Sequence, residues 1–194
     1  FCALGVPASG GGVHLDAEIT PPSGQSATTP TTRTAYYQLE MNNTSFESCR
    51  SQTAGGGLYA KLCKVSLHNC AFRGCEADYL PITEASSGGG GMALLYGSAR
   101  LFSVSAEACR AHYGGFALID GGSYFEAGDS GYSSGSDSVR EPGVLISGCE
   151  AWGLPACTST ASRLGRGGAF YVDRSILSLQ VGTINGSLAI RDGG

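Results

Sequence analysis

The chain repeats one short pattern: a Cys, a variable stretch, then a glycine run followed by alternating apolar residues. Four copies begin at Cys49, Cys75, Cys109 and Cys149, and a partial fifth copy opens the chain at Cys2. The glycine runs that follow these cysteines include Gly55, Gly89, Gly114, Gly167 and, in the partial copy, Gly10. A repeat with a period of a few tens of residues predicts a solenoid, in which each unit buries its apolar face only against its neighbours.

The apolar runs in each unit predict strands. Period-two alternation precedes each Cys at 36–41, 64–67, 100–104 and 143–146, and it recurs after the glycines. No helical stripe of useful length is present. We therefore expect two short strands per unit, with the glycines at a corner that requires positive φ or close backbone approach. A β-sandwich with glycine turns is the alternative fold.

Particular motifs carry a resemblance to known proteins. Gly167-Gly-Ala-Phe170 resembles the Gly-Gly-Ala-Ile motif of chlamydial polymorphic membrane protein repeats. Phe46-x-x-Cys49 and Phe72-x-x-Cys75 stand where those repeats have Phe-x-x-Asn, with Cys in place of Asn. The pattern also resembles the repeats of large extracellular algal and protist proteins. This resemblance implies an all-β, right-handed parallel β-helix with long side loops, cross-linked by disulfides.

Eight cysteines in 194 residues indicate an oxidising compartment. In a β-helix the repeated cysteines form a ladder with a spacing of about 4.8 Å, which is within the range of disulfide Cα separations. We expect Cys49 to pair with Cys75 and Cys109 with Cys149. The remaining cysteines, whose pairing stays open, are Cys2, Cys63, Cys70 and Cys157. Buried thiols are the alternative, and a zinc site is disfavoured because no C-x-x-C pair occurs.

Glycosylation signals agree with an extracellular or cell-surface location. Asn42, Asn43 and Asn185 each begin an N-x-Ser/Thr sequon. The Ser/Thr/Pro-rich stretch 20–34 has the composition of an O-glycosylated side loop. Its candidate O-glycosylation sites are Thr28, Thr29, Thr31 and Thr32. We therefore expect covalent glycans on this chain.

We expect residues 1–194 to form a single solenoid segment, with side loops at 20–34 and 121–142. The chain starts with Phe1, so we expect a processed protein or a slice of a longer solenoid. No polar capping unit is recognisable at either end, and open strand edges favour further pairing. The expected partner is therefore another copy, or more of the same solenoid. The net charge of −4 argues against nucleic acid, and no apolar run is long enough to span a membrane.

The residues do not predict an active site. Glycoside hydrolysis requires two carboxylates at a defined separation, but the candidates Asp16, Glu18, Glu40, Asp120 and Asp173 are scattered along the chain. Gly131-Tyr-Ser-Ser-Gly135 matches the nucleophile-elbow pattern without the strand and helix that the pattern requires. His112 follows Cys109 closely, yet a nucleophile–base pair must also meet in space. We expect no catalytic residue.

No resident cofactor or metal is predicted. Acidic residues in the second side loop offer oxygen ligands of the kind calcium prefers, but without a recognised spacing. They are Glu126, Asp129, Asp137 and Glu141. We regard solvation of these carboxylates as the simpler interpretation.

We therefore predict a non-enzymatic extracellular glycoprotein that builds a surface appendage, fibril or matrix by end-to-end stacking. An adhesin or carbohydrate-binding stalk is the second hypothesis, with tyrosines as candidate stacking surfaces. A polysaccharide lyase or hydrolase is the third, because fold alone does not determine function.

Overall fold

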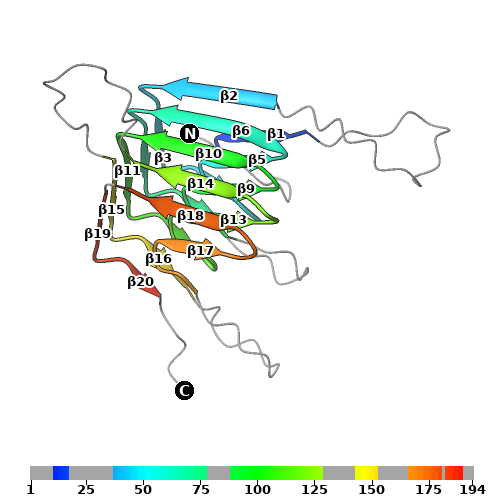
Figure 1. Cartoon of the computed structure of the whole chain (residues 1–194). Helices are drawn as coiled ribbons and strands as arrows, with labels where there is room; N and C mark the ends of the chain where they lie inside the picture. The colour runs from blue at the N-terminus through cyan, green and yellow to red at the C-terminus, as the bar shows by residue number, and fades with distance from the viewer. Residues whose placement is uncertain are drawn as a thin grey trace, which may run out of the picture.

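The computed structural model describes residues 11–17, 37–77, 88–128, 143–152, 166–180 and 182–189. These residues form 20 strands and no helix. The strands assemble into four sheets of five strands each. Figure 1 shows how they are arranged in space. We number the sheets I to IV in the order in which the chain visits them.

Sheets I and II contain most of the longer strands. Sheet I consists of β1 (Val13–Asp16), β5 (Leu58–Lys61), β9 (Met92–Leu95), β13 (Ala117–Asp120) and β17 (Phe170–Val172). Sheet II consists of β2 (Tyr37–Asn42), β6 (Cys63–His68), β10 (Ser98–Phe102), β14 (Tyr124–Ala127) and β18 (Ile176–Leu179).

Sheets III and IV are built from shorter strands. Sheet III consists of β3 (Ser45–Glu47), β7 (Ala71–Arg73), β11 (Val104–Glu107), β15 (Val144–Ser147) and β19 (Gly182–Asn185). Sheet IV consists of β4 (Arg50–Ser51), β8 (Glu76–Ala77), β12 (Arg110–Ala111), β16 (Glu150–Ala151) and β20 (Leu188–Ala189).

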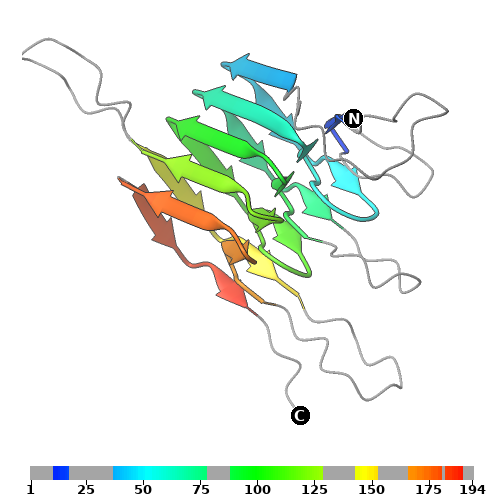
Figure 2. The same ribbon diagram turned by 45° about the vertical axis from the view of Figure 1, so that its right-hand side comes forward.

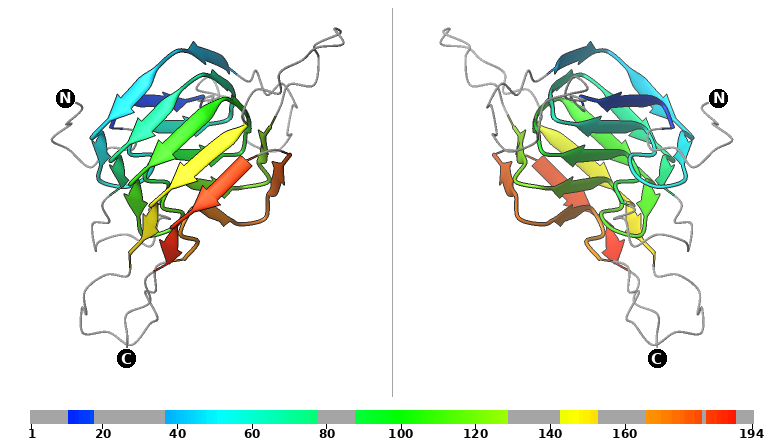
Figure 3. Two further views of the ribbon diagram at one scale, coloured as in Figure 1. Left: turned by 90° about the vertical axis from the view of Figure 1, so that its left-hand side faces the viewer. Right: turned by 90° about the vertical axis from the view of Figure 1, so that its right-hand side faces the viewer.

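Each coil of the molecule contributes one strand to every sheet. The first coil is β1–β4, and the fifth is β17–β20. Strands at the same place in successive coils pair in parallel, as in the register Leu39↔Val65 between β2 and β6. The coils follow one another along a single axis in Figure 2, and Figure 3 shows the stack from two further sides. The predicted parallel β-solenoid is confirmed, and the sandwich alternative, with its antiparallel sheets, is wrong.

The number of strands per coil differs from the prediction of two, because each coil has four. The alternating runs before the first three cysteines became β2, β6 and β10 of sheet II, whereas the run before Cys149 became β15 of sheet III. The strands of sheet IV have two residues each, and β3 and β7 of sheet III have three, which is too short to give a period-two signal. The expected side loop 121–142 also includes a strand, β14, whose Phe125 and Ala127 face the core.

The large aromatic side chains of the core come from different walls of the solenoid in different coils. Phe72 fills the core from sheet III, and a Cβ on Gly57 would lie 2.9 Å from its ring. The third coil has small residues at both positions, Gly91 and Ala106. In the fourth coil the aromatic side chain is Phe116, at the position of Gly57 and Gly91, and a Cβ on Gly91 would lie 2.6 Å from its ring. The small residues of one coil thus leave room for the rings of its neighbours, as close packing requires.

The repeated glycines form a backbone corner before sheet I. Gly55 has a φ of 65°, and its equivalent in the next coil, Gly89, has a φ of 70°. The following residue, Gly56, donates its N–H to Gly89 O at 3.1 Å. A Cβ on Gly56 would overlap the carbonyl oxygen of Gly90. The corner therefore requires glycine for its backbone angle at one position and for space at the next.

Candidate functional site

The repeated cysteines form one continuous ladder inside the solenoid, as predicted. The backbone bonds that align them are Glu76 N–H to Cys49 O and Arg110 N–H to Cys75 O, at 2.8 Å each, followed by Glu150 N–H to Cys109 O at 2.9 Å. All the ladder thiols are buried, with exposed fractions of 2% or less. The ladder occupies the corner between sheets III and IV and ends at Ser187, which follows the same pattern in the fifth coil.

The described cysteines carry thiols in this structure and no disulfide joins them: Cys49, Cys63, Cys70, Cys75, Cys109 and Cys149. The expected pairs Cys49–Cys75 and Cys109–Cys149 are ladder neighbours, and their covalent pairing stays a prediction. Cys63 and Cys70 lie elsewhere in the second coil, in β6 and just before β7. Cys2 and Cys157 lie outside the described residues.

Hydrogen bonds connect the thiols of the ladder to one another and to the backbone. The Cys75 thiol donates to Phe46 O at 3.3 Å, and the Cys109 thiol lies 3.6 Å from Phe72 O. Contacts with the Cys149 and Cys75 sulfurs, together with burial, raise the pKa of Cys109. Cys109 therefore keeps its proton at neutral pH. A buried, protonated thiol is a poor nucleophile, and this description applies to Cys109. The hydrogen bonds with Cys109 lower the pKa of Cys75 and Cys149 instead.

Charged residues flank the cysteine ladder on the outer surface in two columns of alternating sign. In sheet IV, Arg50 lies 2.8 Å from Glu76, and Arg110 lies 3.5 Å from Glu150. Glu76 and Arg110 are in turn register partners, so the four charges alternate along the axis. Such exposed pairs contribute little stability individually. They disfavour wrong registers, since like charges directly opposite one another are destabilising.

The second column lies in sheet III and alternates in the opposite phase. Glu47 lies 3.2 Å from Arg73, and the next register partner of Arg73 is Glu107. The sheet III column loses its charge at the fourth coil, where Ser147 follows Glu107, and it continues with Asn185 in the fifth coil. The sheet IV column loses its charge at the fifth coil, where Leu188 follows Glu150. The last coil therefore differs from the others in being uncharged on these two faces.

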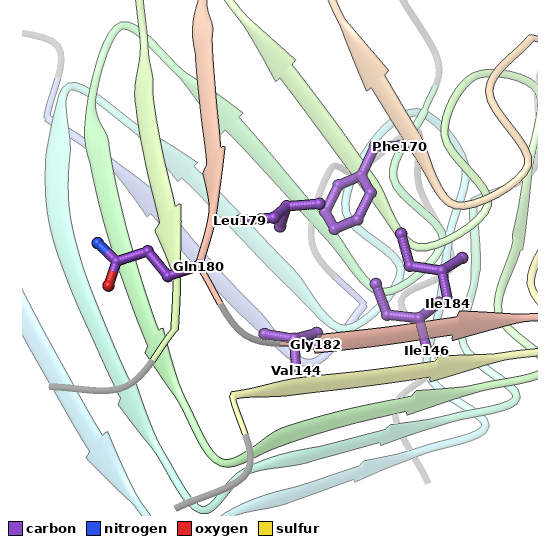
Figure 4. A pocket seen from close by; sticks show the side chains of 7 residues that line it. All are labelled: Val144, Ile146, Phe170, Leu179, Gln180, Gly182 and Ile184. Atoms are coloured by element: carbon purple, nitrogen blue, oxygen red, sulfur yellow. The ribbon is translucent and has the colours of Figure 1, made fainter. Parts of the chain in front are cut away.

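The fifth coil exposes core positions that every inner coil buries. Ile184 is 49% exposed, whereas its register partner Ile146 is fully buried. Gly182 lies opposite Val144 and has no side chain to cover it. The result is a cavity of about 150 Å³, shown in Figure 4. The residues that line it are Val144, Ile146, Phe170, Leu179, Gln180, Gly182 and Ile184.

The core positions of the first coil are less exposed than expected. Phe46, Cys49 and Ser51 occupy core positions there, and each is at most 5% exposed. Their fifth-coil equivalents, Ile184, Ser187 and Ala189, are all more exposed than this. In sheets I and II, by contrast, the first coil does present half-buried apolar residues: Val13, Leu15, Leu39 and Met41. Among the described strands, the coil with the most exposed core is thus the fifth.

The sequon residues Asn42, Asn43 and Asn185 are all exposed. Asn42 ends β2, Asn43 follows it, and Asn185 ends β19. They are accessible positions for glycan attachment. The candidate O-glycosylation sites Thr28, Thr29, Thr31 and Thr32, and the stretch 20–34 that contains them, lie outside the described residues.

Of the candidate catalytic carboxylates that the structure describes, Asp120 and Asp173 come together at the end of sheet I and share one arginine. Asp16 lies 3.3 Å from Lys61 in a salt bridge on the first two coils. Asp120 lies 3.3 Å from Arg174, which also contacts Asp173 at 3.5 Å. Glu40 is an exposed residue of β2, and Glu18 lies outside the described residues. Asp16, Asp120 and Asp173 therefore serve as ion-pair partners. Asp16 and Glu40, in β1 and β2, lie in a different coil from the Asp120–Asp173 pair.

Two of the three histidines, His14 and His68, belong to side-chain stacks, whereas His112 is buried. His14 stacks on Tyr59 with ring centroids 4.7 Å apart, and His68 stacks on Phe102 at 4.6 Å. His112 Nδ1 lies 2.8 Å from the carbonyl oxygen of Trp152. The Cys109 thiol is directed at backbone carbonyls inside the coil instead. Cys109 and His112 therefore do not form a nucleophile–base pair.

Metal ligands do not cluster in the part of the chain that the structure describes, where no group of three or more His, Cys, Asp or Glu side chains converges. Of the four calcium candidates, Glu126 pairs with Arg100 at 3.2 Å, and Asp129, Asp137 and Glu141 lie outside the described residues. Within the described ranges, no helix has the length and apolar character needed to cross a membrane.

Comparison with known proteins gives no relative from which a function can be transferred: no family model, curated protein or solved structure matches this chain. Function must therefore be argued from the geometry. The features that sequence reasoning missed are the cavity around Gly182 and a polar groove beside Asn42. Both depend on residues brought together from different coils, and no local motif marks them.

Proposed function

We propose that this chain is a non-enzymatic, extracellular structural glycoprotein that extends a fibril or surface layer by end-to-end stacking of copies. The observation that carries the proposal is the exposed apolar end of the fifth coil. There, β17–β20 have a described neighbour on one side only. Open parallel edges over an exposed apolar interior favour addition of another coil.

A second copy has the right shape to cover this end. Its first coil has the same four-sided strand order, and its half-buried residues continue the ladders of the fifth coil. Leu39 occupies the same ladder as Leu177, and Met41 the same ladder as Leu179. Stacking would place aliphatic side chains against aliphatic side chains, and each fully buried Leu or Ile contributes roughly 1.5–3 kcal/mol.

The electrostatics of the two ends allow the same contact. Glu47 and Arg50 of the arriving copy would meet the uncharged Asn185 and Leu188, so neither column places like charges together. A contact that joins different surfaces of two copies does not close on itself, and it generates a filament. The sequon residues are exposed on the first coil (Asn42 and Asn43) and on the fifth coil (Asn185), so their glycans would lie on the filament surface beside the contact.

The test compares two lysine substitutions in sheet III. Ile184→Lys places a charge on the open end of the core, whereas Leu145→Lys places one on the outer face of the neighbouring strand. The two native side chains are nearly equally exposed, at 49% and 51%. Sedimentation velocity and negative-stain microscopy should show concentration-dependent filaments for the wild type and for Leu145→Lys, and monomers for Ile184→Lys. Monomeric wild type at high concentration, or a closed dimer, would contradict the proposal.

The glycoprotein part needs its own measurement. The protein should be secreted from a eukaryotic host and its intact mass compared before and after enzymatic removal of N-glycans. A loss of mass that maps to peptides containing Asn42, Asn43 or Asn185 is expected. Full secretion without any N- or O-linked sugar would refute this part and leave the stacking proposal standing.

A further inference from the structure

A polar groove of about 510 Å³ follows the corner between sheets II and III across the first three coils. Its volume is in the range of ligand-binding pockets. Six residues from three coils line it: Asn42, Asn43, His68, Asn69, Phe102 and Ser103. Neither the stacking proposal nor the cysteine ladder uses any of these side chains.

One wall of the groove is a column of outward side chains. Asn42, His68 and Phe102 are register partners in β2, β6 and β10. The His68 and Phe102 rings stack with centroids 4.6 Å apart and planes inclined by 28°. Ser66 Oγ lies 3.0 Å from His68 Nε2 and holds the imidazole in place. This wall therefore presents a preorganised strip of ring carbons that is only partly buried.

The other wall is a column of small polar residues in left-handed backbone conformation. Asn43, Asn69 and Ser103 have φ values of 52°, 51° and 50°. Asn69 Nδ2 donates to Asn43 Oδ1 at 2.6 Å. Each carboxamide has another polar atom beyond this bond, a donor on Asn43 and an acceptor on Asn69. The wall thus offers hydrogen-bonding groups at fixed positions.

This pairing of walls matches the chemistry of a sugar. A pyranose ring has an apolar face of C–H groups and a rim of hydroxyls that donate and accept hydrogen bonds. The six lining residues, all within the described part of the chain, include no Asp, Glu, Lys or Arg. A neutral sugar is therefore favoured over a uronate or a phosphate. Successive coils are about 4.8 Å apart, and a 1,4-linked pyranose chain advances by a similar distance per sugar.

We propose that this groove binds a neutral hexopyranose oligosaccharide. His68 and Phe102 contact its C–H faces, and Asn42, Asn43 and Asn69 contact its hydroxyls. The sugar has two conceivable sources. One is a separate polysaccharide, and the other is a glycan attached to the chain itself, because Asn42 and Asn43 are both sequon residues on the groove. The proposal does not depend on stacking, since the groove lies on the side of the first three coils.

The first arm of the test uses full-length, unglycosylated Ile184→Lys protein, in which the axial contact is removed and the groove is intact. Cellohexaose, N-acetylchitohexaose and mannohexaose are titrated while the ring signals of His68 and Phe102 are followed by NMR. At least one sugar should shift both signals in a saturable way and leave His14, which is stacked elsewhere on Tyr59, unchanged. Phe102→Ala should lower the association constant at least tenfold.

Matched variants separate recognition from folding. Phe102→Tyr keeps the ring and should keep binding, whereas Tyr96→Ala removes an exposed ring outside the groove and should change nothing. Asn69→Gly removes the carboxamide while tolerating the positive φ, and it should weaken binding without unfolding the protein. Equal losses in Phe102→Ala and Tyr96→Ala would contradict the assigned contacts.

The second arm tests an attached glycan as the source. Thr44→Ala removes the sequon of Asn42 only, and Ser45→Ala removes that of Asn43 only. In protein secreted from a eukaryotic host, an attached sugar in the groove predicts that one of these variants changes the His68 and Phe102 signals. If the three oligosaccharides and both sequon variants leave these signals unchanged, the proposal is overturned.

Discussion

Phe46 and Phe72 lie directly over one another in successive coils, with ring centroids 4.7 Å apart and ring planes inclined by only 8°. They are register partners in β3 and β7. The Phe72 ring also meets Phe116 edge-on at 5.6 Å. The column of rings thus changes from stacked to perpendicular where the large side chain moves to the opposite wall of the solenoid.

This position makes Phe72 the most informative single core truncation. It is fully buried, and its neighbours on both sides are aromatic. Phe72→Ala should lower the free energy of unfolding by about 3–5 kcal/mol. Leu145→Ala on the outer face of the same sheet should change it by less than about 0.5 kcal/mol. Urea denaturation followed by circular dichroism measures both, and similar losses would contradict the packing described.

The fold could be predicted from the sequence because each repeat of the sequence corresponds to one coil of the solenoid. The Cys repeat correctly predicted a ladder of cysteines, and the glycine pairs correctly marked a corner. The strands of sheets III and IV that have only two or three residues could not be recognised. A strand such as β8, with two residues, is defined by hydrogen bonds to other coils rather than by its own alternation.

The candidate sites were harder to foresee for the same reason. The cavity of the fifth coil exists because Gly182 lies opposite Val144, a relationship between residues 38 positions apart that depends on the register of β15 and β19. The groove depends similarly on Asn43, Asn69 and Phe102 meeting from three coils. Register is set by the whole stack, so a local pattern does not reveal it.

The glycine corner gives a second prediction, which separates steric overlap from backbone strain. Gly56→Ala should destabilise the protein strongly, because the new Cβ overlaps backbone oxygen rather than a flexible side chain. Gly74→Ala is the matched control. Its φ is 56°, but its Cβ would meet only Ser48 Oγ at 3.9 Å. The free energy of unfolding of the Gly74→Ala control should fall by about 1–2 kcal/mol. In thermal unfolding, Gly56→Ala should melt at a clearly lower temperature than this control.

The cysteine ladder gives a third prediction. Under oxidising conditions, non-reducing peptide mapping should join Cys49 to Cys75 and Cys109 to Cys149, because these pairings use all four ladder sulfurs. A bond between Cys75 and Cys109 would leave the two outer cysteines without a ladder partner. Cys49→Ser should therefore release Cys75 to compete for Cys109, and the map should become mixed. A link from Cys49 to a distant cysteine in the wild type would disprove the assignment.

The last prediction concerns alkaline pH in the presence of a reductant, where the thiols stay unpaired. Burial raises the pKa of Cys63 above its usual value of 9.0. The unfolded chain then loses this proton first, so the folded state binds more protons above pH 9.0. The stabilising effect of the raised pKa is complete below that pH and is lost as the pH rises towards the folded-state value. Cys63 is a simpler probe of this pH effect than the ladder cysteines, because in the ladder Cys109 lowers the pKa of Cys75 and Cys149 through hydrogen bonds.

The measurement is the free energy of unfolding in urea at a series of pH values from 7 to about 10.5. Wild type should lose stability progressively above pH 9.0, and Cys63→Ala should lose less over the same interval. Val65→Ala is the control, because it truncates a buried neighbour in the same strand without removing an ionisable group. It should shift the whole curve downwards and keep the wild-type slope. A Cys63→Ala curve parallel to the wild type would show that the Cys63 thiol ionises equally easily in the folded and unfolded states.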